Sequence, residues 1–176
     1  MITATKKYTA NEFRQLEEGD YQQLINQQLI MSPSPSSKHQ EISAVIFTQI
    51  YSFVQKNKLG KAFCAPLDVY FDEDNVFEPD ILFVSAQRMD IIKENGIHGA
   101  PDIILEILSV SSGYHDTKTK KRIYEKHGVK EYWMVDPMDG EVMGYKNKNG
   151  KFVEIHKGMG PFTLQILNLK IQMTDN

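Results

Sequence analysis

The acidic residue Glu106 stands inside an unbroken apolar run, residues 103–108, which is typical of a strand covered on both faces. Burying a carboxylate there costs several kcal/mol unless a cation or a full set of hydrogen bonds compensates it. Glu106 therefore either meets a positive charge or belongs to a functional site.

A second carboxylate and a lysine can complete such a site. Asp80 follows Pro79 in the apolar run 77–84, and strand alternation puts it on the same face as Leu82. Carboxylates on neighbouring strands can hold Mg²⁺ or Mn²⁺. Lys120 lies in a predicted helix, residues 117–127, on the stripe that should face the sheet. The stripe consists of Asp116, Lys120, Ile123, Tyr124 and His127. An ammonium beside a metal can orient a water or stabilise charge on a phosphate.

Each of these residues also has a purely structural interpretation. Asp80 can simply end a turn, and Glu106 with Lys120 can form a structural ion pair. The basic residues off the stripe, from Lys118 to Arg122, are either a solvated face or a phosphate contact. His39, at the start of a predicted helix, is a capping or core residue, or it meets a phosphate at the helix N-terminus.

The pattern of elements predicts an α/β protein with a mixed central sheet. Helices are expected at 9–17, 37–56, 88–95 and 117–127, the first two starting with capping boxes at Thr9 and Ser37. Strands are expected at 21–25, 28–31, 67–71, 78–84, 103–109, 131–136, 142–146 and 152–156. The strand–helix–strand unit 103–135 should be a right-handed parallel crossover. The tail, residues 162–173, should add a strand or pack on the core.

Length and composition limit the number of domains and the class of protein. The 176 residues fit one domain, 1–176, with 41% hydrophobic and 24% charged residues. The net charge of −3 does not indicate a nucleic-acid binder but does not exclude one. Cys64 is the only cysteine, which excludes an intrachain disulfide. The polar start and the lack of an apolar run of roughly 18 residues predict a cytoplasmic protein without a membrane contact.

Taken together, these motifs resemble the PD-(D/E)xK nuclease superfamily, in particular its bacterial branch of small restriction endonuclease-like proteins. The resemblance runs roughly from Tyr21 to Tyr145. The matching stretches are Pro33-Ser34-Pro35 with His39, Glu78-Pro79-Asp80-Ile81-Leu82-Phe83-Val84, residues 99–109 around Glu106, Asp116 and Lys120 to Tyr124, and Gly128-Val129-Lys130-Glu131-Tyr132-Trp133-Met134-Val135-Asp136-Pro137.

The resemblance implies a restriction endonuclease-like core of one helix, three strands, a second helix and a fourth strand, with extra N- and C-terminal hairpins. It makes Asp80, Glu106 and the carbonyl of Ile107 ligands of Mg²⁺ or Mn²⁺. The lysine usually found two residues after the glutamate is replaced by Leu108, and Lys120 takes its role from the following helix.

Gln23 takes the place where the family often has a glutamate, which removes one negative charge. Accessory roles are implied for His39, Gln23, Asp116 and Tyr124. The function implied is metal-dependent phosphodiester hydrolysis in DNA. A homodimer is expected, because cutting both strands of a duplex is simplest with two sites. Two alternatives stay open: a catalytically weak nucleic-acid-binding or assembly module on the same scaffold, and an α/β protein that does not bind nucleic acid.

Overall fold

The structure is a computed structural model that describes residues 6–16, 22–31, 34–109 and 114–173, apart from the side chains of Gln22 and residues 114–117. Pro33 of the predicted motif lies outside these residues.

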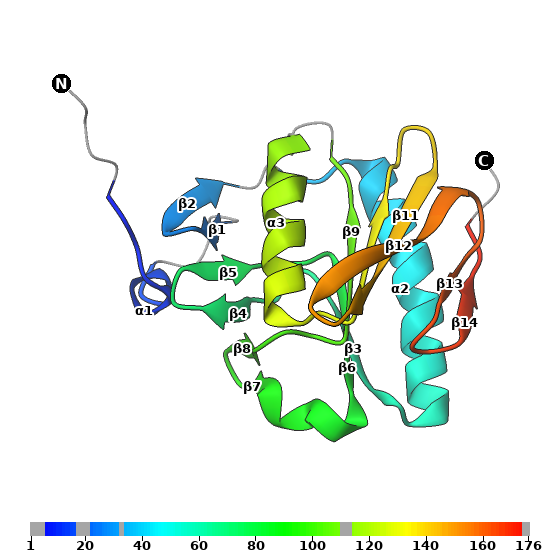
Figure 1. The fold of residues 1–176 in the computed structure, drawn as a ribbon, viewed down its shortest axis with the longest axis horizontal. Helices are drawn as coiled ribbons and strands as arrows, with labels where there is room; N and C mark the ends of the chain where they lie inside the picture. Colours follow the sequence, from blue (N-terminus) through cyan, green and yellow to red (C-terminus); the bar gives the residue numbers. More distant parts are fainter. Residues whose placement is uncertain (1–5, 17–21, 32–33, 110–113, 174–176) are drawn as a thin grey trace.

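A six-stranded mixed sheet, called here the central sheet, forms the middle of the molecule (Figure 1). Its strands in spatial order are β12 (Lys151–Met159), β11 (Glu141–Lys148), β10 (Glu131–Val135), β9 (Ile103–Ile107), β6 (Ile81–Ser85) and β3 (Gly60–Cys64). Within it β9 and β10 run parallel and are joined through helix α3 (Tyr114–His127), while the other neighbours are antiparallel. The predicted parallel crossover is thereby confirmed.

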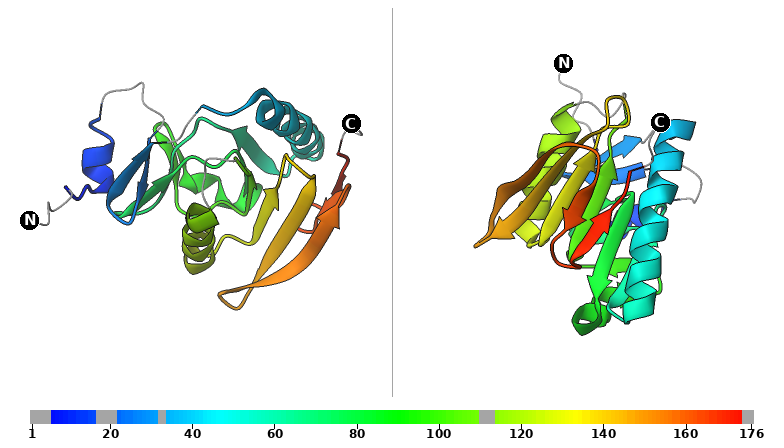
Figure 2. Two further views of the ribbon diagram at one scale, coloured as in Figure 1. Left: turned by 90° about the horizontal axis from the view of Figure 1, so that it is seen from above. Right: turned by 90° about the vertical axis from the view of Figure 1, so that its right-hand side faces the viewer.

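Helices cover both faces of the central sheet (Figure 2). On one face, the long helix α2 (Ser37–Asn57) buries a stripe that includes Ile46 and Ile50 against Leu105 and other strand residues. On the other face, Ile123 and Tyr124 of α3 pack against apolar residues of β6, β9 and β10. All five residues of β9 are buried, as its apolar sequence predicts.

A second six-stranded sheet lies beside α3 (Figure 1). Its strands in spatial order are β2 (Gln28–Met31), β1 (Gln22–Ile25), β5 (Asn75–Phe77), β4 (Val69–Asp72), β8 (Gly96–His98) and β7 (Ile92–Lys93). Helix α1 (Ala10–Phe13) adjoins it through the hydrogen bond from Ala10 N to Glu73 O. The predicted capping box between Thr9 and Glu12 is confirmed.

The hairpin of β13 (Phe162–Leu164) and β14 (Leu169–Ile171) packs on the α2 side of the molecule. Gln49 of α2 fixes it with two hydrogen bonds to the backbone of Gln172, each 2.9 Å long. The tail thus forms strands and also packs on the core. In the part of the chain that the structure describes, no helix has both the length and the apolar character needed to cross a bilayer.

Three details of the sequence prediction were wrong. The strand expected at 67–71 is β4 of the second sheet, and β3 takes its place in the central sheet. The helix expected at 88–95 is a 3-10 helix, η1 (Ala86–Ile91), followed by the β7–β8 hairpin around Asn95-Gly96. Helix α2 is capped by Ser36, not Ser37, because the Ser36 hydroxyl accepts a hydrogen bond from His39 N at 3.2 Å.

Candidate active site

Asp80 and Glu106 lie at the same end of the central sheet. Asp80 directly precedes β6, Glu106 is near the end of β9, and the antiparallel pairing sets Ile81 opposite Leu105. The backbone N–H of Ile107 donates a hydrogen bond of 2.7 Å to Oδ2 of Asp80. The strand register therefore brings the two predicted carboxylates together.

Helix α3 supplies two donors to Glu106. The ammonium of Lys120 lies 3.3 Å from Oε1, and the Tyr124 hydroxyl donates to the same oxygen at 2.6 Å. These donors are four residues apart, so they lie on one face of the helix. All three residues are buried, and Lys120 is only 8% exposed. Lys120 thus faces the sheet, as the helical stripe predicts.

The electrostatics of Glu106 favour a further positive charge. Burial raises the pKa of Glu106 above its ordinary value, and the carboxylate of Asp80 adds to this rise. Lys120 and Tyr124 act in the opposite direction but do not outweigh it. The ionised carboxylate is therefore under-compensated by its protein partners.

His39 holds the other carboxylate from the α2 side. It lies in the first turn of α2, is buried, and places Nε2 3.3 Å from Oδ2 of Asp80. The hydrogen bond to Asp80 is the main reason that the pKa of His39 is raised, and the Ile107 carbonyl and the Glu106 charge add to it while burial opposes it. His39 thus contacts the carboxylate end of the sheet; a phosphate contact stays a prediction.

The donor atoms fit a hard divalent cation. Among the described residues, hydrogen bonds and ion pairs reach Asp80 through Oδ2 and Glu106 through Oε1, so each carboxylate keeps a second oxygen for a ligand. With the nearby Ile107 carbonyl, this is an all-oxygen set of the kind that Mg²⁺ and Mn²⁺ prefer. No three His, Cys, Asp or Glu side chains in the described ranges form a metal-binding group, so water would have to complete the shell.

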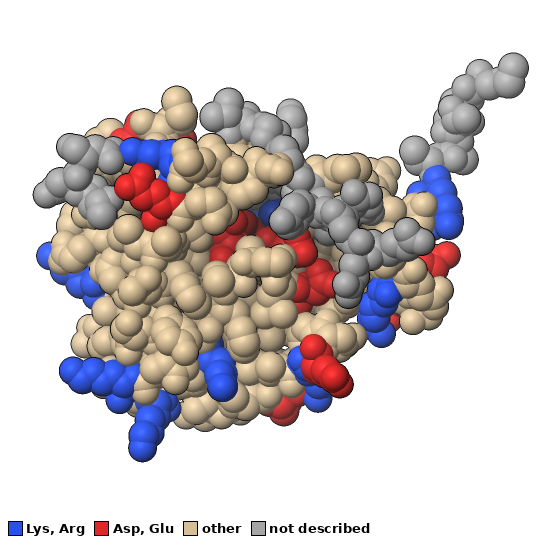
Figure 3. All heavy atoms as spheres, turned by 180° about the vertical axis from the view of Figure 1, so that it is seen from behind, with Lys and Arg blue, Asp and Glu red and all other residues tan. Residues whose placement is uncertain are grey.

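A further acid, Glu78, lies within electrostatic range of Lys120 and of Asp68. Glu78, just before Pro79, has a pKa raised by burial and by the charge of Asp68, and Lys120 opposes the rise. Figure 3 shows acidic side chains gathered in a hollow of the face seen from behind. Neither acid was predicted from the sequence as a site residue: Glu78 stands beside Asp80 in the chain, but Asp68 approaches Glu78 only because the second sheet packs there.

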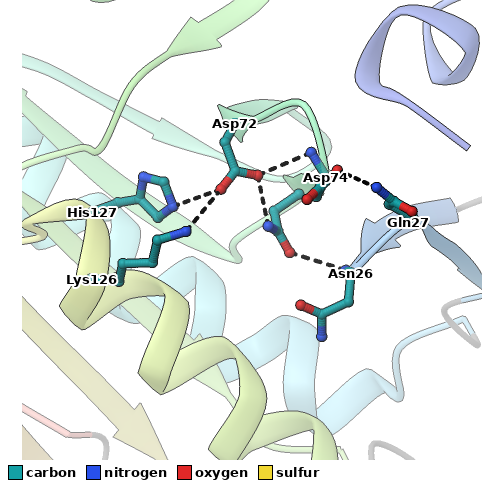
Figure 4. A network of polar contacts seen from close by, with 7 residues as sticks. Asn26, Gln27, Asp72, Asp74, Lys126 and His127 are labelled. Carbon is teal, nitrogen blue, oxygen red and sulfur yellow. Dashed lines mark hydrogen bonds and ion pairs between the residues drawn. The ribbon is translucent and has the colours of Figure 1, made fainter.

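A polar network fixes the C-terminal end of α3 (Figure 4). Oδ2 of Asp72 lies 3.0 Å from His127 Nε2 and 3.4 Å from Lys126 Nζ, while Oδ1 accepts a hydrogen bond of 2.7 Å from Asn75. Asn75 in turn accepts a bond from the backbone N–H of Asn26 in the β1–β2 turn. The helix that carries Lys120 is therefore tied to the second sheet at its far end.

Comparison with known proteins then places the chain. A model of the Uma2 family, described as "Putative restriction endonuclease", matches residues 10–173. The chain belongs to the Uma2 family. A solved structure similar to it is described as a putative nuclease belonging to DUF820 from Anabaena variabilis ATCC 29413; it is 24% identical, with a TM-score of 0.76 over 91% of this chain and 90% of that one. At this identity the likeness shows the fold, and it confirms the predicted nuclease-like α/β architecture. No match was found among curated proteins.

The structure describes the remaining candidate residues of this Uma2 protein only in part. Gln23 is buried in β1, and the side chain of Asp116 lies outside the described ones. The ammonium of Lys121 lies 3.3 Å from the centroid of the Tyr145 ring, whereas Arg122 is exposed. Of the basic residues off the stripe, Arg122 therefore has the geometry of a solvent-facing contact and Lys121 does not.

Proposed function

We propose that this protein is a metal-dependent endonuclease that hydrolyses phosphodiester bonds in DNA. The observation that carries the proposal is the group of Asp80, Glu106 and Lys120 at one end of β6 and β9, in which the buried lysine lies 3.3 Å from the buried Glu106 carboxylate, whose pKa is raised. Membership of a family described as putative restriction endonucleases supports the same chemistry.

The residues divide the work as follows. One oxygen each of Asp80 and Glu106, with the Ile107 carbonyl, would hold Mg²⁺ or Mn²⁺. When bound, the ion supplies Lewis-acid polarisation of the phosphate and a more acidic water. The N–H of Ile107 keeps Asp80 in place through its 2.7 Å bond. Lys120 holds the attacking water or neutralises the developing charge on the phosphate.

The proposed substrate is duplex DNA, cut by a homodimer. Two sites related by twofold symmetry are the simplest arrangement for cutting both strands. The carboxylates themselves repel phosphate, so the cation would also serve as the bridge to the DNA backbone.

A second candidate function is a catalytically weak nucleic-acid-binding or assembly module on this scaffold. The observation that favours it is Gln23, a buried neutral amide where the resemblance leads one to expect a glutamate. The direct contact between Lys120 and Glu106 is equally what a structural ion pair would show.

A cleavage assay separates these functions. Supercoiled plasmid, linear duplex and single-stranded DNA are each incubated with Mg²⁺, Mn²⁺ or EDTA. The parent should cleave with metal only, Asp80→Ala should lose cleavage, and Asp90→Ala, which changes an exposed acid in η1, should retain it. Absence of cleavage by the parent on every substrate would favour the binding module.

A further inference from the structure

The two donors that bind Glu106 are not equivalent. Both reach Oε1, but the Tyr124 hydroxyl does so at 2.6 Å and the Lys120 ammonium at 3.3 Å. The first distance is that of a strong O–H···O⁻ hydrogen bond, whereas the second is longer than the 2.7–2.9 Å of a well-formed N⁺–H···O⁻ bond. Tyr124 is therefore the tighter partner of the carboxylate.

The surroundings make Tyr124 the more rigid partner as well. Its ring is fully buried and packs against Phe71, Phe77 and Tyr132, with centroid distances of 5.3, 5.6 and 5.1 Å. A ring held on several sides has no room to change its rotamer. Its hydroxyl is thus fixed relative to β9.

Lys120 has the freedom that Tyr124 lacks. Its charge acts on Glu78 as well as on Glu106, and its four-carbon stem has several rotatable bonds. The ammonium can therefore leave Oε1 and stay near a negative charge, which Tyr124 cannot do.

We propose that Tyr124 is the positioning residue of this site: its hydroxyl holds Glu106 in the orientation that presents the second carboxylate oxygen to the cation, and this frees Lys120 for the water or the phosphate. The inference rests on the proposed function and deepens it. The two donors to Glu106 then have separate tasks: Tyr124 orients the metal-binding carboxylate, and Lys120 takes part in the chemistry. Partners that orient a metal ligand in this way typically contribute 10–100-fold to metal affinity or activity.

The test is titration of the protein with Mn²⁺ by calorimetry, with thermal unfolding in EDTA as the measure of folding. Tyr124→Phe removes the hydroxyl and leaves the ring, so Mn²⁺ should bind about tenfold or more weakly. The protein should stay folded in EDTA, with a moderately lower unfolding temperature because a buried carboxylate has lost a donor. The matched control is Tyr132→Phe, which removes a hydroxyl from the same aromatic cluster and should bind Mn²⁺ like the parent. Lys120→Met should lose cleavage but bind Mn²⁺ at least as tightly, because a nearby positive charge is gone.

Each alternative result is decisive. If the parent binds no Mn²⁺, the proposed function fails and the role of Tyr124 fails with it. If the parent binds and Tyr124→Phe binds equally tightly, the inference alone is overturned. Equal weakening by Tyr124→Phe and Tyr132→Phe would assign the effect to ring packing. A tenfold loss in Lys120→Met would make Lys120 the positioning donor, which also overturns the inference and can be read even if Tyr124→Phe does not fold.

Discussion

Glu106 is a buried carboxylate beside a second carboxylate, and this makes its charge a cost to the metal-free fold. Glu106→Gln keeps an oxygen for Tyr124 and Lys120 and removes the negative charge that burial and the Asp80 carboxylate disfavour. We expect it to stabilise the protein in EDTA by about 1 kcal/mol, measured by denaturant unfolding at pH 7. Because the folded pKa of Glu106 is raised, its penalty appears as the pH rises above the unfolded value of about 4.3. The gain should therefore shrink toward acid pH.

The control for this prediction is the same substitution at Glu131. Burial raises the pKa of Glu131 too, but its two oxygens accept hydrogen bonds from Trp133 Nε1 and from the backbone N–H groups of Gln165 and Ile166. An amide N–H₂ there would face donors, so Glu131→Gln should destabilise the fold by roughly 1–3 kcal/mol. Loss of stability in both variants would instead favour a structural Glu106–Lys120 pair.

Lys120 can be separated from the other basic residues of α3 by comparing cleavage with binding. Lys120→Ala should abolish metal-dependent cleavage and leave the Kd for a DNA duplex nearly unchanged, because the ammonium is buried and serves the reacting centre. Arg122→Ala should cleave bound DNA as fast as the parent but bind DNA more weakly, and its Kd should depend less steeply on salt concentration. Both are measured at one fixed salt concentration. Cleavage that survives in Lys120→Ala would mean that another residue carries the chemistry.

The sequence predicts those parts of the site that depend on local patterns, but not those that depend on contacts between segments far apart in the chain. Glu106 stands out because it interrupts an apolar strand, and Lys120 follows from helical periodicity, so both are local signals. The contact between His39 and Asp80 depends on how α2 lies across the sheet, and no local pattern encodes it. The same holds for Glu78, whose interactions with Lys120 and Asp68 depend on how α3 and the second sheet pack against the end of β6.

At the scale of elements, the pairing of β10 with β11 depends on a close approach between Gly144 and the ring of Trp133. Gly144 lies opposite Trp133, and an added Cβ would stand 2.3 Å from the nearest atom of the indole ring. Since Trp133 is buried, the ring cannot move aside freely, and Gly144→Ala should cost about 1–3 kcal/mol in unfolding free energy. Gly158→Ala on the paired strand β12, where nothing lies within 4 Å, should be close to neutral. Comparable losses in both variants would argue against the clash.

The elements themselves were predictable where a periodic pattern matched a buried face. Helix α2 and strand β9 show this, because their apolar residues follow the helical stripe and the continuous run that burial on the sheet requires. Strand β3 was missed since Ala62 is its only buried residue, so no alternation is visible. The β7–β8 hairpin was missed because its strands are only two and three residues long, too short to show an alternating pattern.

At the scale of the whole molecule, charge places a limit on how DNA can bind. The chain has a net charge of −3, and acidic side chains gather in the hollow shown in Figure 3. Several lysines are already paired with acids, among them Lys126, Lys130 and Lys151. Without a cation, the acidic hollow repels a phosphate backbone, and pairing of lysines with acids reduces the gain from counterion release.

DNA binding should therefore depend on a divalent cation even when no cleavage occurs. Ca²⁺ takes the same oxygen ligands as Mg²⁺, with looser geometry, and can bridge carboxylates and a phosphate. We expect Ca²⁺ to tighten binding of a short duplex by about tenfold or more relative to EDTA, as measured by fluorescence anisotropy at constant ionic strength, a gain of about 1.4 kcal/mol. Asp80→Ala should bind equally with Ca²⁺ and with EDTA, because the bridge has lost a ligand, whereas Asp90→Ala should behave like the parent. Equally tight binding of the parent in EDTA would show that DNA is held elsewhere on the surface than at Asp80 and Glu106.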